Sequence, residues 1–389
     1  MTRPVRVVLA CSGLDHAHRG FESFARSCFL ALGNQPEIEI ELLKGTGTAG
    51  HRERSMPALS RDSPLARVLG RLAGREPFRV EQLAFALSLQ PALLREAPDV
   101  VYFSEWHTGV GLALLRRLTR ASYRLVLCNG TMAVEGFEHL DRVQELTPVA
   151  LRLILERGAN PARHTLLPLG VSMQPRLHLV GADDRIALRR RLGLPTDRPI
   201  LLSVAALNRY HKRIDQLIEE VSRLPEPRPF LLLAGQAEAQ TPELRSLAAR
   251  RLAPDGHRFL TVPHSEIGDL YRASDAFVLC SLGESFGLVL VEAMSYGLPC
   301  FAHDYEITRF VLGDHGRLAN LSEPGALAGL LGDPAAYRPD PAAAQRRHRF
   351  AYDSFSWDRL TPRYVELLRE AANSTVSSCT DEKLSNQKR

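Results

Sequence analysis

Short runs rich in valine, isoleucine and leucine alternate with helix-like stretches along most of this chain. The first such unit reads VRVVLACSG, then FESFARSCFLAL, then EIEIELLKG. A strand, a helix and a second strand in this order predict a parallel sheet, because the crossover helix returns the chain to the starting edge. The alternation therefore predicts an α/β fold with helices on the faces of parallel sheets.

The alternation stops in a polar stretch, QPRLHLVGADDR, and begins again with PILLSVAAL, IDQLIEEVSRL and PFLLLAG. A chain of 389 residues is also too long for one core, since single cores stop growing at roughly 250 to 300 residues. We expect two facing doubly wound Rossmann-like domains, 1–172 and 185–352, with a helix at 356–372 packed back on the first. Ligands of such sheets bind beyond the carboxyl ends of the strands, so we expect a site between the domains. The polar residues 373–389 predict a disordered tail.

The composition is that of a folded, water-soluble protein, with 45% hydrophobic and 24% charged residues. No apolar run approaches the roughly 20 residues that span a bilayer, and the N-terminal apolar stretch is too short for a signal peptide, so we expect a cytoplasmic protein. The six cysteines lie far apart and no D-x-D triplet occurs, which predicts neither a disulfide framework nor a metal site. A net charge of +5 over this length does not indicate nucleic acid.

The segment 51–80 is rich in arginine and contains an amphipathic helix pattern. The arginines that recur every four residues are Arg67, Arg71 and Arg75. Another side of the same helix would carry Leu65, Val68, Leu69 and Leu72. Such a helix can lie on an anionic membrane or meet an anionic substrate, which would make the protein peripheral at the inner membrane face. A solvated helix face is the alternative.

The run GESFGLVLVEAMSYGLP, residues 283–299, follows the predicted strand DAFVLCS. We expect a helix from about Phe286 to Tyr296, ended by Gly297 in a left-handed conformation. Its free N-terminal amides would lie at the carboxyl end of a parallel strand. Gly287 there would let a ligand approach the backbone closely, and this combination is typical of a phosphate site.

Glu292 lies two turns inside this predicted helix, among apolar neighbours. An unpaired buried carboxylate is very unfavourable, so it must have a partner or lie at the edge of a cleft. The vicinal diol of a nucleotide ribose would offer two donors to its two oxygens, and an arginine is the structural alternative. Glu284 precedes the helix, where the helix dipole favours an acidic residue whatever its function.

Cations crowd the start of a second predicted helix, which follows the strand PILLSVAAL. They are Arg209, His211, Lys212 and Arg213. The helix dipole disfavours positive charge at this end by roughly 0.3 to 1 kcal/mol for each residue. A bound anion would remove the conflict, whereas side chains that splay into water are the alternative. Two strand-to-helix turns of one domain thus predict phosphate binding.

These segments, in this order, resemble the retaining glycosyltransferases of the GT-B fold, glycosyltransferase family 4. GESFGLVLVEAMSYGLP is similar to the E-x7-E segment of that family, and SVAALNRYHKRIDQLIEE resembles its phosphate-gripping strand and helix. TLLPLGVS is similar to its interdomain segment, and FSWDRLTPRYVELLREA to its closing helix. The resemblance covers roughly residues 5–372 and is strongest from residue 165 onward.

The resemblance implies that Glu292 holds the ribose of a UDP- or GDP-linked sugar and that Glu284 lies near hydroxyls of the transferred sugar. Further contacts to the donor are implied for Ser285, Phe286, Gly287 and Leu288. Lys212 and an arginine would grip the diphosphate. The usual Gly-Arg-Leu of the family is Ala-Ala-Leu here, at 205–207, so the arginine would be Arg209 or Arg213, and we prefer Arg209.

In the first domain, the loop HAHRGFESF resembles the glycine-rich loop of the family and retains Gly20. The strand end LCNGTM places Asn129 and Gly130 where the family usually presents a histidine to the donor sugar. The contacts to the donor sugar, and so its identity, stay open.

The family implies retaining transfer to a hydroxyl acceptor, such as a glycan, a glycolipid or a small metabolite, without a metal or further cofactor. An inverting enzyme would need a side-chain base, and His16 or His18 could serve. Two alternatives stay open. One is a nucleotide-sugar epimerase or a phosphorylase of the same architecture, and the other is a non-catalytic protein that binds membranes or other anions.

Overall fold

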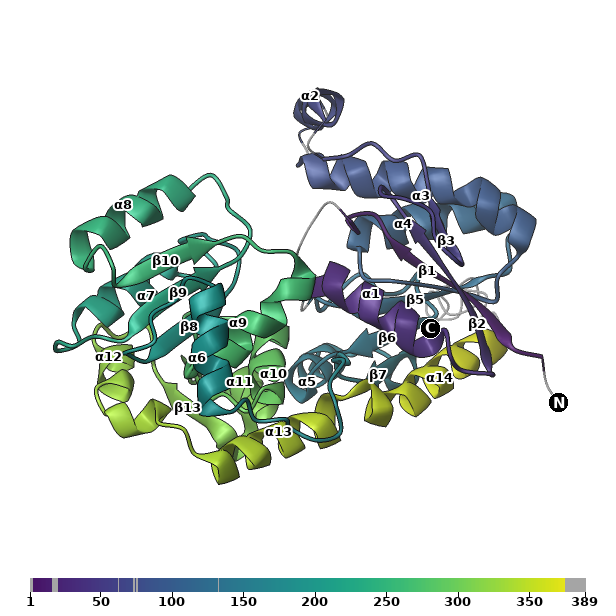
Figure 1. Ribbon diagram of the computed structural model, residues 1–389. Coiled ribbons are helices and arrows are strands. Elements are labelled where there is room, and N and C mark those ends of the chain that lie inside the picture. The colour runs from purple at the N-terminus through teal and green to yellow at the C-terminus, as the bar shows by residue number, and fades with distance from the viewer. Residues whose placement is uncertain are drawn as a thin grey trace.

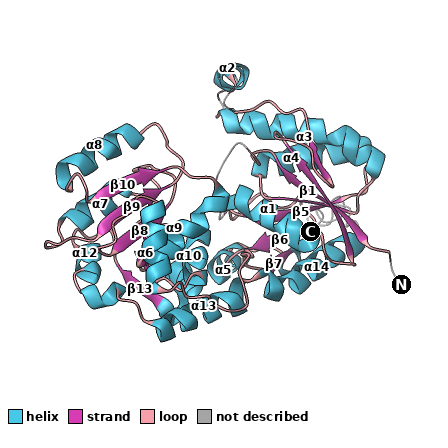
Figure 2. Cartoon of the chain, viewed as in Figure 1, coloured by secondary structure: helices cyan, strands magenta, loops and turns pink. Residues whose placement is uncertain are grey.

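The protein forms two α/β domains that lie side by side, each built on one parallel sheet (Figure 1). Helices flank the strands of both sheets (Figure 2). The computed structural model describes residues 3–15, 20–61, 63–72, 74, 76–131 and 133–374. This architecture confirms the predicted fold class.

Within the described residues, the first sheet has seven strands in the order β3-β2-β1-β4-β5-β6-β7. They are β1 (Val5–Cys11), β2 (Ile38–Lys44), β3 (Glu53–Ser55), β4 (Val100–Phe103), β5 (Arg124–Asn129), β6 (Arg142–Glu145) and β7 (His164–Leu166). The central strand β1 pairs with β2 through Val5 and Ile38, and with β4 through Val7 and Val100. Every neighbouring pair in this sheet is parallel.

Helices cover both faces of the first sheet. They are α1 (Gly20–Leu32), α2 (Pro64–Leu72), α3 (Pro77–Glu96), α4 (Trp106–Thr119), α5 (Pro148–Glu156) and α14 (Trp357–Asn373), with a short 3-10 turn η1 (Pro161–Arg163). On one face, Phe85 of α3 and Leu112 of α4 belong to the same buried cluster as Val8. On the other face, Phe24 of α1 and Tyr364 of α14 are buried together.

In the part of the chain that the structure describes, the second sheet has six strands in the order β10-β9-β8-β11-β12-β13. They are β8 (Ile200–Val204), β9 (Phe230–Ala234), β10 (His257–Leu260), β11 (Ala276–Leu279), β12 (Cys300–His303) and β13 (Gly316–Ala319). Its helices are α6 (Ala182–Arg191), α7 (Ile214–Ser222), α8 (Thr241–Arg251), α9 (Ile267–Ala273), α10 (Leu288–Ser295), α11 (Glu306–Leu312), α12 (Ala326–Leu331) and α13 (Pro341–Phe355), with 3-10 turns η2 (His264–Glu266), η3 (Gly313–His315) and η4 (Pro334–Tyr337). The helices α7, α8 and α12 share one buried cluster with the sheet, and α9, α10 and α11 share the other.

The chain passes to the second domain after Val171 and returns at Ser356, and these two passages are hydrogen-bonded to each other. The N–H of Val171 donates to the carbonyl of Phe355 at 2.8 Å, and the N–H of Trp357 donates to the carbonyl of Val171 at 3.2 Å. Gly170 lies against the indole of Trp357, where an added Cβ would come within 2.5 Å of the ring. The last helix, α14, then contacts α1 and the first sheet.

The structure corrects several boundaries that the sequence predicts. The helix expected at 286–296 is α10, which begins at Leu288 because Gly287 caps it in a left-handed conformation with φ of 84°. Gly297 is left-handed as expected, with φ of 76°. Asn373 belongs to α14 and not to the tail, and residues 375–389 lie outside the described residues.

Several elements have no counterpart in the sequence prediction, the longest being α3. Its buried residues include Phe85 and Leu93, whereas Leu87 and Leu94 are exposed, so its apolar residues surround the helix and show no single face. Pro91 lies inside it and reads as a helix breaker in the sequence. Among the described helices, none is both long and apolar enough to cross a bilayer.

Candidate functional site

Two strand-to-helix turns of the second domain meet in an ion pair. Lys212, from the turn after β8, places its Nζ 2.5 Å from Oε1 of Glu284, from the turn after β11. The two side chains are 24% and 14% exposed. The structure therefore brings together two of the predicted site residues, and water still reaches both of them.

The position of Lys212 is set by a tight turn in its backbone. The side-chain oxygen of Asn208 accepts hydrogen bonds from the N–H of Lys212 at 2.9 Å and of His211 at 3.1 Å. The amide of Asn208 in turn donates to Glu238 at 3.1 Å. Arg213 then takes a left-handed conformation, with φ of 49°, immediately before α7. The lysine is thus presented from a fixed backbone at the start of a helix.

The position of Glu284 is set from β12 and the residues that follow it. Its N–H donates to the hydroxyl of Tyr305 at 2.6 Å. The ring of Tyr305 stacks on His303, with ring centres 5.5 Å apart. Burial raises the pKa of Tyr305 well above its usual value, so this hydroxyl stays neutral and continues to accept the hydrogen bond.

A row of backbone N–H groups lies next to this ion pair. Gly287 is the left-handed cap of α10, and an added Cβ there would lie 3.9 Å from Cβ of Glu284 and 3.2 Å from Leu290. No acceptor in the described part of the chain takes the N–H of Phe286, Gly287 or Leu288. Those three residues and the half-buried Ser285 therefore present free donors beside Lys212, as a phosphate site requires.

Glu292, within α10, is paired with a tyrosine. The hydroxyl of Tyr271 donates to its Oε2 at 2.9 Å, and Tyr271 stacks on Tyr296 with ring centres 5.1 Å apart. Burial raises the pKa of Glu292 to about 7, and the hydrogen bond from Tyr271 lowers it in part. Neither an arginine nor any hydrogen bond to Oε1 occurs among the described contacts of Glu292, so the arginine alternative does not apply.

The two predicted arginines point elsewhere. Arg209 donates to Asp215 and to Glu243, both at 3.3 Å, and its side chain is 48% exposed. Arg213 donates to the carbonyl of Leu321 at 2.7 Å. The structure therefore brings Lys212, but neither guanidinium, to Glu284.

Three of the site residues predicted in the first domain lie among the described residues, namely Gly20, Asn129 and Gly130. Gly20 begins α1, and an added Cβ there would meet nothing within 4 Å. Asn129 is 2% exposed, and its amide donates to Glu145 at 2.9 Å and to the carbonyl of Ala133 at 3.0 Å. Gly130 follows it, with the hydroxyl of Ser104 3.0 Å from an added Cβ. His16 and His18 lie outside the described residues.

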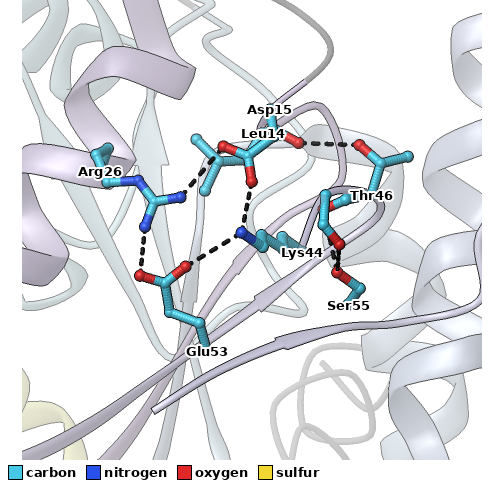
Figure 3. Close-up of polar contacts among 8 residues, drawn as sticks. Leu14, Asp15, Arg26, Lys44, Thr46, Glu53 and Ser55 are labelled. Atoms are coloured by element: carbon cyan, nitrogen blue, oxygen red, sulfur yellow. Dashed lines mark hydrogen bonds and ion pairs between the residues drawn. The ribbon is translucent and has the colours of Figure 1, made fainter. Parts of the chain in front are cut away.

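An ion cluster around the buried Lys44 of the first domain was not predicted from the sequence. Lys44 ends β2, is 2% exposed, and donates to Asp15 at 2.5 Å and to Glu53 at 3.1 Å. Arg26 of α1 contacts the same two carboxylates, at 3.2 and 2.5 Å (Figure 3). Burial alone would raise the pKa of Asp15 and Glu53, but the two cations outweigh it and lower both. The cluster ties the turn after β1 to β2, β3 and α1.

The buried carboxylate of Glu105 links the residues that follow β1 and β4. Glu105 accepts hydrogen bonds from the N–H and hydroxyl of Ser12, at 2.8 and 2.6 Å, and from the hydroxyl of Thr108 at 2.9 Å. Burial raises the pKa of Glu105, and these hydrogen bonds lower it in part. In the sequence, an acidic residue two positions after the strand DVVYF is the signal that could have identified it.

Among the described side chains, no group of three or more histidine, cysteine, aspartate or glutamate residues is arranged to hold a metal ion. The cysteines of the described residues are free and buried: Cys11, Cys28, Cys128, Cys280 and Cys300.

Comparison with known proteins shows that the site residues lie in a segment that resembles a known family. Residues 184–331 match the family model of glycosyl transferases group 1. This segment contains Lys212, Glu284, Gly287 and Glu292, so the ion pair, the amide row and Glu292 all lie in the part of the chain that matches this family model.

Two curated relatives match over a longer part of the chain. The D-inositol 3-phosphate glycosyltransferase of Geodermatophilus obscurus is 32% identical over 242 residues, which is 59% of this chain and 52% of that protein. The enzyme of the same name from Xylanimonas cellulosilytica is 33% identical over 223 residues, 55% of this chain and 53% of that protein. The aligned region thus spans about half the length of these relatives.

Solved structures match nearly the whole chain. Sucrose-phosphate synthase from Thermosynechococcus elongatus superimposes with a TM-score of 0.75 at 19% identity, over 94% of this chain and 98% of that one. HepE from Anabaena, solved in complex with UDP-glucose, gives a TM-score of 0.72 at 17% identity, over 94% and 99%. At these identities the likeness establishes the fold, which is the GT-B arrangement of two Rossmann-like domains.

Proposed function

We propose that the protein is a glycosyltransferase that moves a sugar from a nucleotide diphosphate sugar to a hydroxyl acceptor, with retention and without a metal. The observation that carries this proposal is the Lys212–Glu284 pair beside the free N–H groups at Gly287. The names of the curated relatives support the reaction class, and the HepE complex with UDP-glucose supports the class of donor.

In this proposal the diphosphate lies on the N–H groups of Gly287 and Leu288, where the start of α10 favours negative charge. Lys212 leaves Glu284 and takes a phosphate oxygen as its new partner. Glu284 is then free to accept hydrogen bonds from hydroxyls of the transferred sugar. The ribose lies at Glu292, whose Oε1 is free to accept a hydroxyl. The base of the donor in this proposal is uracil or guanine.

Lys212 is the cation that we assign to the diphosphate. Arg209 would first have to leave Asp215 and Glu243, and Arg213 would have to leave a backbone carbonyl. Lys212 exchanges one anion for another at nearly the same place, so its charge remains paired throughout. The exchange therefore avoids the penalty of leaving a partly buried charge unpaired.

The proposed step breaks the bond between the anomeric carbon and the diphosphate oxygen, which keeps the electron pair. The acceptor oxygen bonds to the anomeric carbon on the same face, and its proton passes to the departing phosphate. Negative charge on that phosphate grows along this path, so donors fixed around it stabilise the transition state more than the ground state. No cofactor besides the donor takes part, and we place the reaction in the cytoplasm.

A two-stage experiment tests the proposal. A panel of UDP- and GDP-sugars is first screened by thermal shift, since a ligand that binds the folded state stabilises it. Release of nucleotide is then measured with the stabilising donor and a panel of hydroxyl acceptors, and the anomeric configuration of the product is read by NMR. Turnover of donor alone would indicate an epimerase, and an inverted product would exclude retention.

Replacement of Lys212 by alanine is the sharpest variant for this assay. Loss of one preorganised donor to a developing anion typically lowers kcat by about 100-fold to 1,000-fold, and we expect a loss of this order. Arg250→Ala, on an exposed arginine of α8, removes the same charge away from the pair and serves as the matched control. Wild-type turnover by the Lys212→Ala protein would contradict the proposal.

A further inference from the structure

One side of the first domain leaves many apolar side chains exposed. Of the large apolar residues that are exposed among the described ones, four lie on α2, three on α3, three on α4 and five elsewhere. The ten on these helices are Leu65, Val68, Leu69 and Leu72, then Phe78, Leu87 and Leu94, then Val110, Leu114 and Leu118. Because α2 contacts α3 and α3 contacts α4, we call this surface the α2–α4 face.

The helix α2 stands out from the domain over α3 (Figure 1). Its buried residues are Ala66 and Gly70, which place one side of the helix toward the domain. With about 100° between successive residues, its leucine-rich residues form a different side. That side is open to water, since Leu65 and Leu72 are 56% and 80% exposed. The helix is therefore held by two small residues and presents its large apolar residues outward.

Positive charge surrounds this apolar surface. The exposed arginines on the three helices and at their ends are Arg67, Arg71, Arg79, Arg95, Arg117 and Arg120. The exposed carboxylate among the described residues there is Glu76. In the first part of the basic segment 51–80, arginines form ion pairs within the domain. Arg54 pairs with Glu41 and Glu96, and Arg61 pairs with Glu81. Arg75 lies outside the described residues.

We propose that the α2–α4 face binds the surface of an anionic lipid bilayer. Apolar side chains flanked by arginines match the boundary between acyl chains and anionic headgroups, where a helix lies in the plane of the interface. A second copy of this chain is a poorer partner, because a two-fold contact through the same face would bring its arginines against one another. The exposed leucines likewise distinguish this face from one that binds a polyanion through charge alone.

The test is co-sedimentation of the full chain with vesicles of phosphatidylcholine alone and with added phosphatidylglycerol. Binding is expected only with the anionic lipid, and it is expected to weaken with salt. The double variant Arg67→Gln with Arg71→Gln should weaken binding by about 30-fold, since each arginine near such a surface contributes a factor of about five. Val68→Ser with Leu72→Ser should also weaken it.

Matched controls lie on other surfaces of the protein. Arg190→Gln with Arg250→Gln removes two exposed charges from the second domain, and Leu30→Ser changes a side chain of α1 that is 59% exposed. Both should bind as the wild type does. All these substitutions are at exposed positions, and circular dichroism checks that each variant is folded.

Three results would overturn the proposal. The first is equal binding to neutral and anionic vesicles, or none to either. The second is binding that the Arg67/Arg71 and Val68/Leu72 variants leave unchanged. The third is a dimer of the wild type, seen by light scattering, that Val68→Ser with Leu72→Ser converts to a monomer.

Discussion

Replacing Glu292 by glutamine should make the protein more stable at neutral and alkaline pH while weakening its binding of donor. The substitution keeps the shape of the side chain and removes its charge. The hydroxyl of Tyr271 can still donate to the remaining oxygen, so the contact at 2.9 Å is retained. The difference between the two proteins therefore reports the cost of a charged group at this position.

The magnitude follows from the pKa of Glu292, which burial raises from 4.5 to about 7. Between these two values the folded protein binds a proton that the unfolded chain has released, so the wild type loses stability relative to the variant as the pH rises from about 4.5 to about 7. The full difference corresponds to at most about 3 kcal/mol and stays constant above pH 7. Below pH 4.5 both side chains are neutral, and the two proteins should be equally stable.

The assay is urea denaturation of both proteins at a series of pH values from 4 to 8, roughly spanning the two pKa values. Donor binding is measured in parallel by calorimetry with UDP or GDP. A ribose diol favours the charged carboxylate, so wild-type binding should weaken by about tenfold per pH unit below the pKa. The Glu292→Gln protein should bind weakly throughout and without this pH dependence.

Two results would refute this reasoning. If the wild type and the variant unfolded with the same pH dependence, Glu292 would not be an acid whose pKa is raised by the fold. If the variant bound nucleotide as tightly as the wild type at pH 8, the carboxylate would have no part in holding the ribose, and the raised pKa would be a property of packing alone.

Two further predictions concern stability. Lys44→Met should destabilise the protein by about 1 to 3 kcal/mol in urea denaturation, because it removes a buried cation and leaves two carboxylates with Arg26 alone. Arg3→Met, at an exposed ion pair, should cost under about 1 kcal/mol. Equal effects of the two substitutions would contradict the burial of Lys44. Gly170→Ala should lower the free energy of unfolding by about 1 to 3 kcal/mol, because it forces a Cβ against the indole of Trp357. Gly329→Ala is the control, since nothing lies within 4 Å of an added Cβ there, and it should be neutral or stabilising. A thermal melt of both variants measures the difference.

The alternation of strands and helices was readable from the sequence because most strands here are buried on both faces and are almost wholly apolar. The strand β6 was not, since its residues Gln144 and Glu145 are polar yet fully buried. Their partners come from far along the chain: Gln144 donates to Tyr364 at 2.8 Å, and Glu145 contacts His164 at 2.9 Å. A local sequence pattern does not indicate a strand whose polar side chains are hydrogen-bonded to residues distant in the sequence.

The candidate site could also be predicted only in part. Lys212 was identified because the helix dipole disfavours a cation before a helix. Glu284 was identified because its segment resembles the E-x7-E segment of a known family. The direction of Arg209 was not, because its partner Glu243 lies 34 residues along the chain, on another helix. The pairing of Glu292 with a tyrosine could likewise not be predicted. Tyr271 belongs to α9, and its sequence context is that of an ordinary core residue.

A structure of the protein with bound UDP or GDP tests the proposed donor site most directly. We expect the diphosphate within hydrogen-bonding distance of the N–H groups of Gly287 and Leu288, with Nζ of Lys212 moved from Glu284 onto a phosphate oxygen and the ribose hydroxyls at Glu292. A nucleotide bound elsewhere, or one bound here while Lys212 stays on Glu284, would contradict the assignment of this turn as the donor site.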